Sequence, residues 1–158
     1  MTRLNERITT PLPMEEAFDY LADFANAAEW DPGVATSQQI GSSGPAVGAR
    51  YRLGIRRGDS VVPMEYRIVA LEPPSRVVLE GSGSGVTATD EIRFERSATD
   101  TIVDYTADIR LTGLRRIAEP FLGGTFRRIA ADASDGIRRT LAARAARTGA
   151  EPSGRDAA

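Results

Sequence analysis

The sequence predicts an α+β domain in which a curved antiparallel sheet of about seven strands wraps around one long C-terminal helix. From residue 35 to residue 111, apolar and polar side chains alternate between turn signals. This is the pattern of antiparallel strands that bury one face and expose the other. From residue 114 to residue 147, apolar side chains recur every four residues instead, which is typical of an amphipathic helix. A sheet with a helix packed on one face belongs to the α+β class.

The N-terminal part predicts a strand followed by two short helices. Arg3–Thr9 alternates well enough to form the first strand. Pro13 is placed to open a helix at its first position, where the missing proline N–H would have no partner anyway. Phe24–Glu29 predicts a second short helix, and the strong turn signal Asp31-Pro32-Gly33 ends it.

Turn signals divide the alternating region into strands. They stand at Gly41–Pro45, Arg57–Asp59, Pro73–Pro74 and Gly81–Gly85. The glycine-rich stretch Gly81–Gly85 precedes a strand rather than a helix, so we interpret it as a hairpin turn and not as a phosphate-binding loop. The outward-facing acids stand among arginines and predict a solvated ladder of cross-strand ion pairs. These acids are Glu65, Glu91, Asp104 and Asp108.

The long helix is predicted over Leu114–Arg147. Its apolar face carries Ile129, Ala133, Ile137 and Leu141. Pro120 fits only near the start of a helix, and we interpret Gly123-Gly124 as a kink or a local opening. We therefore expect residues 1–147 to form a single domain. Residues 148–158 are small, polar and aperiodic, and they predict a disordered tail.

The composition excludes several chemistries. The 158 residues contain no cysteine and no histidine, and all 20 basic residues are arginine. A thiolate nucleophile, a Ser–His–Asp triad, an ordinary zinc site and a lysine Schiff base are therefore excluded, and we expect no metal and no cofactor. Acid–base work would fall to Asp, Glu or Tyr. The net charge of -2 argues against a nucleic-acid partner.

The chain shows no targeting signal that we can identify. Met1–Thr10 is polar, and no segment approaches the length needed to span a membrane. We therefore expect a cytoplasmic protein without an integral membrane segment. The sequence leaves open whether two copies form a homodimer.

Several stretches of the chain resemble one group of known proteins. They are Ile8–Phe18, Asp23-Phe24 with Asn26, Glu29–Gly33, Gly48–Tyr51, Leu71–Arg76 and Asp90–Phe94. Together they resemble the START-like (SRPBCC) superfamily, and within it the polyketide cyclase/dehydrase and lipid-transport type, over about Arg3 to Arg147. The resemblance implies a helix-grip fold with a deep cavity between the sheet and the long helix. It also implies an apolar ligand such as a sterol, lipid or polyketide, with cyclisation or dehydration in some members. It assigns no catalytic residue, because the superfamily shares no single catalytic motif.

Asp90 is the sharpest candidate for a functional side chain. The alternation places it on the inner face with Ala88 and Ile92, where an unpaired carboxylate is costly. It must be paired with an arginine, be hydrogen-bonded, be turned outward by a bulge, or have a raised pKa that makes it the best catalytic acid or base. Three tyrosines also fall on inner faces: Tyr51, Tyr66 and Tyr105. Their hydroxyls would meet either a ligand or backbone partners in the core.

Three further aromatic side chains are candidate walls of the cavity. Trp30, the only tryptophan, would either line an entrance or cap the second helix against the sheet. Phe121 and Phe126 would form apolar walls near the start of the long helix. The stretch Pro120–Gly124 would act as a lip where ligands enter, or would be a tolerated irregularity.

These features predict a domain that binds a hydrophobic or aromatic small molecule in an internal cavity. The alternative is an enzyme of polyketide cyclase or dehydrase type, in which Asp90 or a tyrosine moves the proton and an arginine or tyrosine holds the enolate. A third alternative is a protein-interaction module with a filled core. A cavity in the interior would separate the first two from the third.

Overall fold

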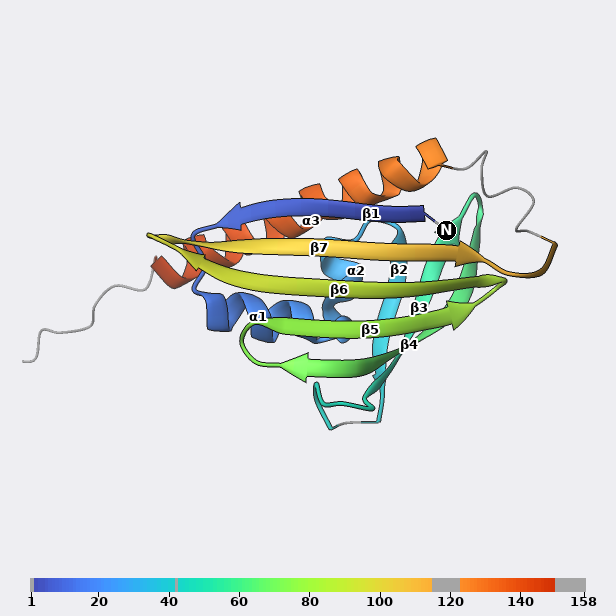
Figure 1. The fold of residues 1–158 in the computed structure, drawn as a ribbon, viewed down its shortest axis with the longest axis horizontal. Helices are drawn as coiled ribbons and strands as arrows, with labels where there is room; N and C mark the ends of the chain where they lie inside the picture. The colour runs from blue at the N-terminus through green and yellow to red at the C-terminus, as the bar shows by residue number, and fades with distance from the viewer. Residues whose placement is uncertain (1, 42, 115–122, 150–158) are drawn as a thin grey trace, which may run out of the picture.

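Seven antiparallel strands form one curved sheet in the order β1-β7-β6-β5-β4-β3-β2 (Figure 1). The computed structural model describes residues 2–41, 43–114 and 123–149. The strands are β1 (Thr2–Thr10), β2 (Val34–Ile40), β3 (Arg50–Arg57), β4 (Ser60–Glu72), β5 (Arg76–Gly83), β6 (Val86–Ser97) and β7 (Asp100–Leu111). Each strand from β2 to β7 pairs with the next along the chain, and β1 pairs with β7. The sheet predicted from the alternation is confirmed.

Helices cover the inner face of the sheet. They are α1 (Met14–Ala22), the 3₁₀ helix η1 (Phe24–Asn26), α2 (Ala27–Trp30) and the long α3 (Gly123–Gly149), which packs most extensively against β1 (Figure 1). The two short helices predicted after the first strand are confirmed, the second being divided into η1 and α2. Pro13 is the N-cap of α1 rather than its first helical residue, because its carbonyl already accepts the Ala17 N–H at 2.9 Å. No helix in the described part of the chain is long and apolar enough to cross a membrane.

The long helix differs from its prediction at its end and on its apolar face. Its described part runs from Gly123, and residues 115–122 of the predicted span lie outside the described residues, so the kink predicted at Gly123-Gly124 stays a prediction. It runs on to Gly149, past the predicted end at Arg147, and residues 150–158 of the predicted tail lie outside the described residues. Ile129 is 43% exposed, although Ile137 and the other members of the predicted ladder are buried. A step of four residues exceeds one helical turn of about 3.6, so a strict four-residue ladder drifts around the helix until one end faces solvent.

Two tight hairpins lie at one end of the sheet. The β5–β6 hairpin turns through Ser84 and Gly85, which both have the positive φ that a type I′ turn requires. The predicted turn at Gly81–Gly85 is therefore confined to its last two residues, and Gly81 belongs to β5. The β3–β4 hairpin turns at Gly58-Asp59, as predicted.

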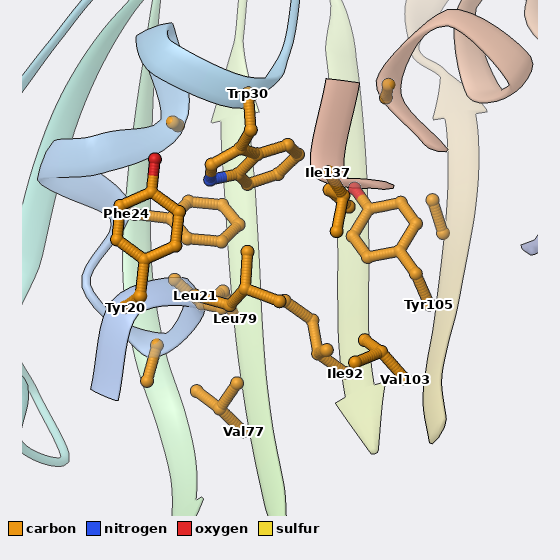
Figure 2. Close-up of a cluster of buried hydrophobic side chains, with 14 of the residues drawn as sticks. Tyr20, Leu21, Phe24, Trp30, Val77, Leu79, Ile92, Val103, Tyr105 and Ile137 are labelled. Carbon is orange, nitrogen blue, oxygen red and sulfur yellow. The ribbon is translucent and has the colours of Figure 1, made fainter. Parts of the chain in front are cut away.

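Small residues occupy several inner positions of the sheet near Asp90. Leu79, Ile92 and Val103 are fully buried in the main core (Figure 2). Toward the β5–β6 hairpin the inner positions include Gly81, Ala88 and Ala107 beside the larger Val86, Ile109 and Leu111. Gly81 stands opposite Ala88, and Ala107 stands opposite Asp90, which lies on β6 between Ala88 and Ile92. Asp90 therefore has alanine neighbours on both β6 and β7.

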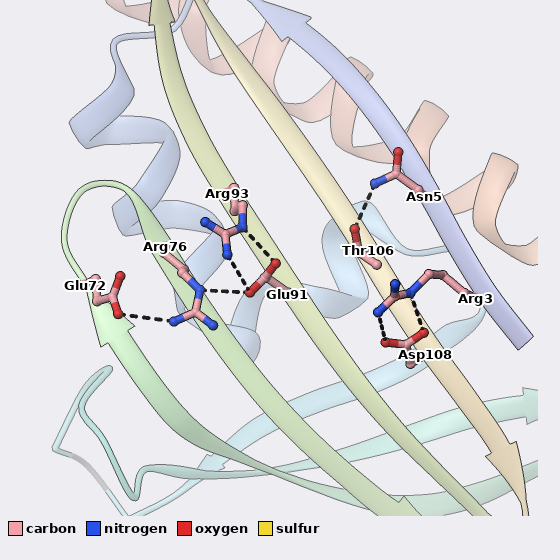
Figure 3. A network of polar contacts seen from close by, with 8 residues as sticks. All are labelled: Arg3, Asn5, Glu72, Arg76, Glu91, Arg93, Thr106 and Asp108. Carbon is pink, nitrogen blue, oxygen red and sulfur yellow. Dashed lines mark hydrogen bonds and ion pairs between the residues drawn. The ribbon is translucent and has the colours of Figure 1, made fainter. Parts of the chain in front are cut away.

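The outer face of the sheet is a ladder of arginine–carboxylate pairs (Figure 3). Arg3 pairs with Asp108 at 2.9 Å, and Arg76 pairs with Glu91 at 2.8 Å. Glu65 and Asp104 also pair with arginines, so the predicted ladder of outward-facing acids is confirmed. Because these pairs are solvated, each contributes only about 0–1 kcal/mol to stability.

A glycine allows α3 to pack directly against the turn that follows α2. Gly136 faces the backbone carbonyl of Trp30, and a Cβ atom at Gly136 would overlap that oxygen. Pro32 lies on the same side of Gly136. The helix therefore packs against Trp30 and Pro32, the residues on either side of Asp31.

We expect Gly136→Ala to destabilise the protein by about 1–3 kcal/mol, because α3 or the turn must move to relieve the overlap. Alanine forms helices better than glycine, so without this overlap Gly136→Ala would raise the free energy of unfolding. A decrease in that free energy therefore indicates the overlap. The free energy of unfolding in urea measures it. Gly124→Ala is the matched control on the same helix, since nothing lies within 4 Å of the added Cβ. Equal stability of the two variants would contradict the close approach.

Candidate functional site

A cavity of about 480 Å³ lies between the inner face of the sheet and α3. Most of its walls are apolar. They include Leu4, Met64, Val86, Ile109 and Leu111 from the sheet and Phe126, Ile129, Ala130 and Ala133 from α3. The β3–β4 and β5–β6 hairpins and the first turns of α3, which all contribute to the lining, lie at the same end of the molecule (Figure 1). The cavity lies beside the small inner residues Ala88 and Ala107, and the interior is not filled throughout.

Two tyrosines and one aspartate line this cavity from three strands. Tyr66 comes from β4, Asp90 from β6 and Tyr105 from β7. Tyr66 can reach the cavity because Gly81 stands opposite it on β5, where a Cβ atom would overlap the Tyr66 ring. A glycine at this position therefore makes room for a large aromatic side chain next to it. The structure brings together three of the predicted site residues.

Asp90 is a buried carboxyl group with a strongly raised pKa. The residue is 3% exposed. Burial raises the pKa of Asp90 to about 7, hydrogen bonding from Tyr105 and from Tyr66 works in the opposite direction, and the charge of Asp31 raises it further. Burial and the neighbouring Asp90 charge also raise the pKa values of Tyr66 and Tyr105 well above 10.0. The phenols thus remain donors at neutral pH, while the carboxyl group is poised to gain or lose a proton.

Asp31 is a second carboxyl group on the cavity wall, and the sequence analysis did not single it out. It follows α2, and its Oδ1 atom accepts the Gly33 N–H at 2.8 Å. Burial raises the pKa of Asp31 to about 6, the bond from Gly33 opposes this, and Asp132 on α3 adds to it. In the sequence, Asp31 is recognisable only as the first residue of a turn. Because turns have no side-chain periodicity, the sequence does not predict that this carboxyl group faces the cavity.

Trp30 and Tyr51 lie in the core and do not line the cavity. Phe24 packs against both, with ring centroids 5.9 Å from Trp30 and 6.3 Å from Tyr51. Trp30 also packs edge-on against Tyr105, with ring centroids 6.1 Å apart (Figure 2). Trp30 therefore contacts a residue of the cavity wall without lining the cavity itself. Within the described residues, Trp30 Nε1 and Tyr51 Oη are buried without a hydrogen-bond partner.

The remaining predicted residues lie near the start of α3. Phe126 is half-buried and lines the cavity, as a wall residue would. Phe121 lies outside the described residues, as do Pro120 and Leu122 of the predicted lip. Among the described residues, no cluster of three or more acidic side chains could hold a metal ion.

The chain belongs to the polyketide cyclase / dehydrase and lipid transport family, because the model of that family matches residues 1–145. The resemblance noted in the sequence is thereby confirmed. No curated protein matches the chain.

Solved structures share the fold at low sequence identity. The Zhui aromatase/cyclase from Streptomyces sp. R1128 is 14% identical, with a TM-score of 0.74 over 96% of this chain and 98% of that one. A START superfamily protein from Mycobacterium smegmatis is 10% identical, with a TM-score of 0.70 over 94% of this chain and 99% of that one. These structures confirm the START-like helix-grip fold.

We expect the free energy of unfolding to fall as the pH rises from about 5 to about 8. The folded state holds protons on Asp90 and Asp31 at higher pH than the unfolded state does, so their contribution is greatest in acid and is lost as pH rises to about 7. Asp90→Asn should flatten this fall, to which Asp90 contributes about 3 kcal/mol between about pH 5 and its pKa of about 7, at about 1.4 kcal/mol per pH unit. Urea unfolding across this pH range measures it.

Glu91→Gln is the control for this experiment. Hydrogen bonds from Arg93 and Arg76 lower the pKa of Glu91, so that group stays ionised throughout the range and its removal should leave the slope unchanged. A wild-type stability that is flat or rises between about pH 5 and about pH 8 would contradict the protonated, buried Asp90.

Proposed function

We propose that this protein binds a hydrophobic or aromatic small molecule of lipid or polyketide-like character in the cavity between the sheet and α3. The observation that carries this proposal is the cavity itself, about 480 Å³ of mostly apolar space with one cluster of polar groups. Small-molecule sites in proteins commonly have volumes of about 300–1,000 Å³ and the same distribution of polarity. The cavity also argues against the third alternative, a module with a filled core.

The lining supports a defined orientation of the ligand. Apolar side chains from the sheet and α3 would bury the body of the molecule. Asp90, Tyr66 and Tyr105 would fix a polar group by hydrogen bonds, since both phenols donate and the carboxyl group can donate or accept. Membership of the polyketide cyclase / dehydrase and lipid transport family supports a polyketide-like or lipid-like ligand.

A second candidate function is acid–base catalysis of the cyclase or dehydrase type. It is favoured by one observation, a buried carboxyl group with a pKa of about 7 between two phenols. Such a group could take a proton from a carbon next to a carbonyl and return it to a departing hydroxyl, while the phenols hold the enolate oxygen. Binding precedes this chemistry, so the cavity supports both functions and the catalytic one requires turnover in addition.

Filling part of the cavity should weaken binding. Ala133 is buried on α3 and lines the cavity, so Ala133→Leu places a larger side chain in the ligand's space. We expect N-phenylnaphthylamine, a neutral probe that fluoresces in apolar sites, to bind the wild type and to bind Ala133→Leu at least about tenfold more weakly. Fluorescence titration measures both Kd values.

Ala143→Leu is the matched control, because Ala143 is exposed on the same helix. It should bind the probe as the wild type does. No fluorescence increase with the wild type, or an equal Kd for Ala133→Leu, would contradict a ligand site in this cavity.

Turnover separates the two candidate functions. If the protein only binds, an aromatic β-hydroxyketone should be bound and recovered unchanged, whether Asp90 is present or replaced in Asp90→Asn. If it is an enzyme, the wild type should form the enone, visible by its ultraviolet absorbance, and Asp90→Asn should lower the rate by about 10²–10⁴-fold. Formation of the enone by the wild type and its loss in Asp90→Asn would replace the binding function with the catalytic one.

A further inference from the structure

The two carboxyl groups of the cavity have no cationic partner, unlike four carboxyl groups on the outer face of the sheet. On the outer face Glu65, Glu91, Asp104 and Asp108 each pair with an arginine. Within the described part of the chain, Asp90 and Asp31 form no ion pair. The protein contains 20 basic residues, all arginine. Several of them pair with carboxylates on the outer face of the sheet, but none of the described arginines pairs with Asp90 or Asp31.

The geometry leaves both carboxyl groups with capacity to bind something in the cavity. Asp90 is 3% exposed, and the side-chain hydrogen bonds that it receives from the described residues come from the hydroxyl groups of Tyr105 and Tyr66. Asp31 uses its Oδ1 atom for the Gly33 N–H, and its Oδ2 atom accepts no hydrogen bond from the described residues. A carboxylate has about four acceptor positions, so each group can accept further donors. An isolated buried carboxylate is costly, and a cation supplied by the ligand would remove that cost.

We propose that the ligand of this cavity is a hydrophobic amine, with an apolar body and a protonated nitrogen that Asp90 and Asp31 hold. This inference rests on the proposed binding function and specifies its ligand class. A protonated amine offers up to three N–H donors, which Asp90, Asp31 and the phenol oxygens can accept. Its charge would also be attracted to the aromatic faces of Tyr66, Tyr105 and Phe126, all of which line the cavity.

The distribution of charge along the cavity orients such a ligand. Arg56 and Arg57 line the cavity at the β3–β4 hairpin, and both side chains are exposed. The interior is acidic and the hairpin end is basic, so a cationic group is favoured inside and disfavoured at the rim. The nitrogen would lie at Asp90, and the apolar body would extend between the small side chains of the sheet and α3.

Three naphthalene derivatives of similar size and different charge test this inference. They are naphthylmethylamine, naphthylmethanol and naphthoic acid, each used to displace N-phenylnaphthylamine at neutral pH. We expect the amine to bind at least about tenfold more tightly than the alcohol, the gain typical of hydrogen bonds to charged groups, and the acid to bind most weakly. In Asp90→Asn the ratio between amine and alcohol should approach one.

Asp104→Asn is the matched control, because Asp104 lies on the outer face of β7 and pairs with Arg7. It should preserve the preference for the amine. Asp31→Asn provides a second test of the cavity charge and should reduce the same ratio.

The outcomes separate this inference from the proposed function. If the alcohol or the acid binds as tightly as the amine to the wild type, the cavity is a ligand site and the amine inference is overturned. If the preference persists in both Asp90→Asn and Asp31→Asn, the inference is also overturned. If neither the probe nor any of the three compounds binds, the proposed binding function fails, and the inference fails with it.

Discussion

The burial of Asp90 without a cation is the constraint on which the rest of the site depends. It lies on β6 between Ile92 and Ala88, on the inner face of the sheet. Two phenols from other strands of the sheet reach it, and they partly offset the cost of burying a carboxyl group. One of them, Tyr66, has its place because the strand opposite carries Gly81. The polar cluster therefore depends on a residue without a side chain at position 81.

The rest of the fold holds this arrangement in place. The alternation along the strands puts apolar residues on one face and ion pairs on the other, so burial fixes the register of the sheet. α3 closes the open side of the inner face, and Gly136 lets it pack on the Trp30 carbonyl. That contact also holds the turn with Asp31, the second carboxyl group of the cavity. The helix is therefore both a wall of the cavity and a support for one of its polar groups.

Much of the fold could be predicted from the sequence, because period-two alternation and turn residues are local signals. The same alternation placed Asp90, Tyr66 and Tyr105 on the inner face, where the structure has them. It could not separate Tyr51 from these three, because Tyr51 stands opposite Tyr66 on the neighbouring strand and periodicity gives the face of a strand but not which of its side chains reach the cavity. Asp31 was not predicted as a site residue, because its orientation depends on a turn that packs against Gly136 of α3. Such contacts between distant parts of the chain leave no local pattern.

Binding of a small molecule in the cavity beside Asp90 can be detected directly through the NMR signals of alanine methyl groups. Ala88, Ala107, Ala130 and Ala133 line the cavity, whereas Ala142, Ala145 and Ala146 lie in a separate groove near the end of α3. An NMR titration of alanine-methyl-labelled protein with naphthylmethanol should shift the resonances of the first group and leave the second unchanged. Shifts confined to the groove, or no shifts at all, would contradict binding in this cavity.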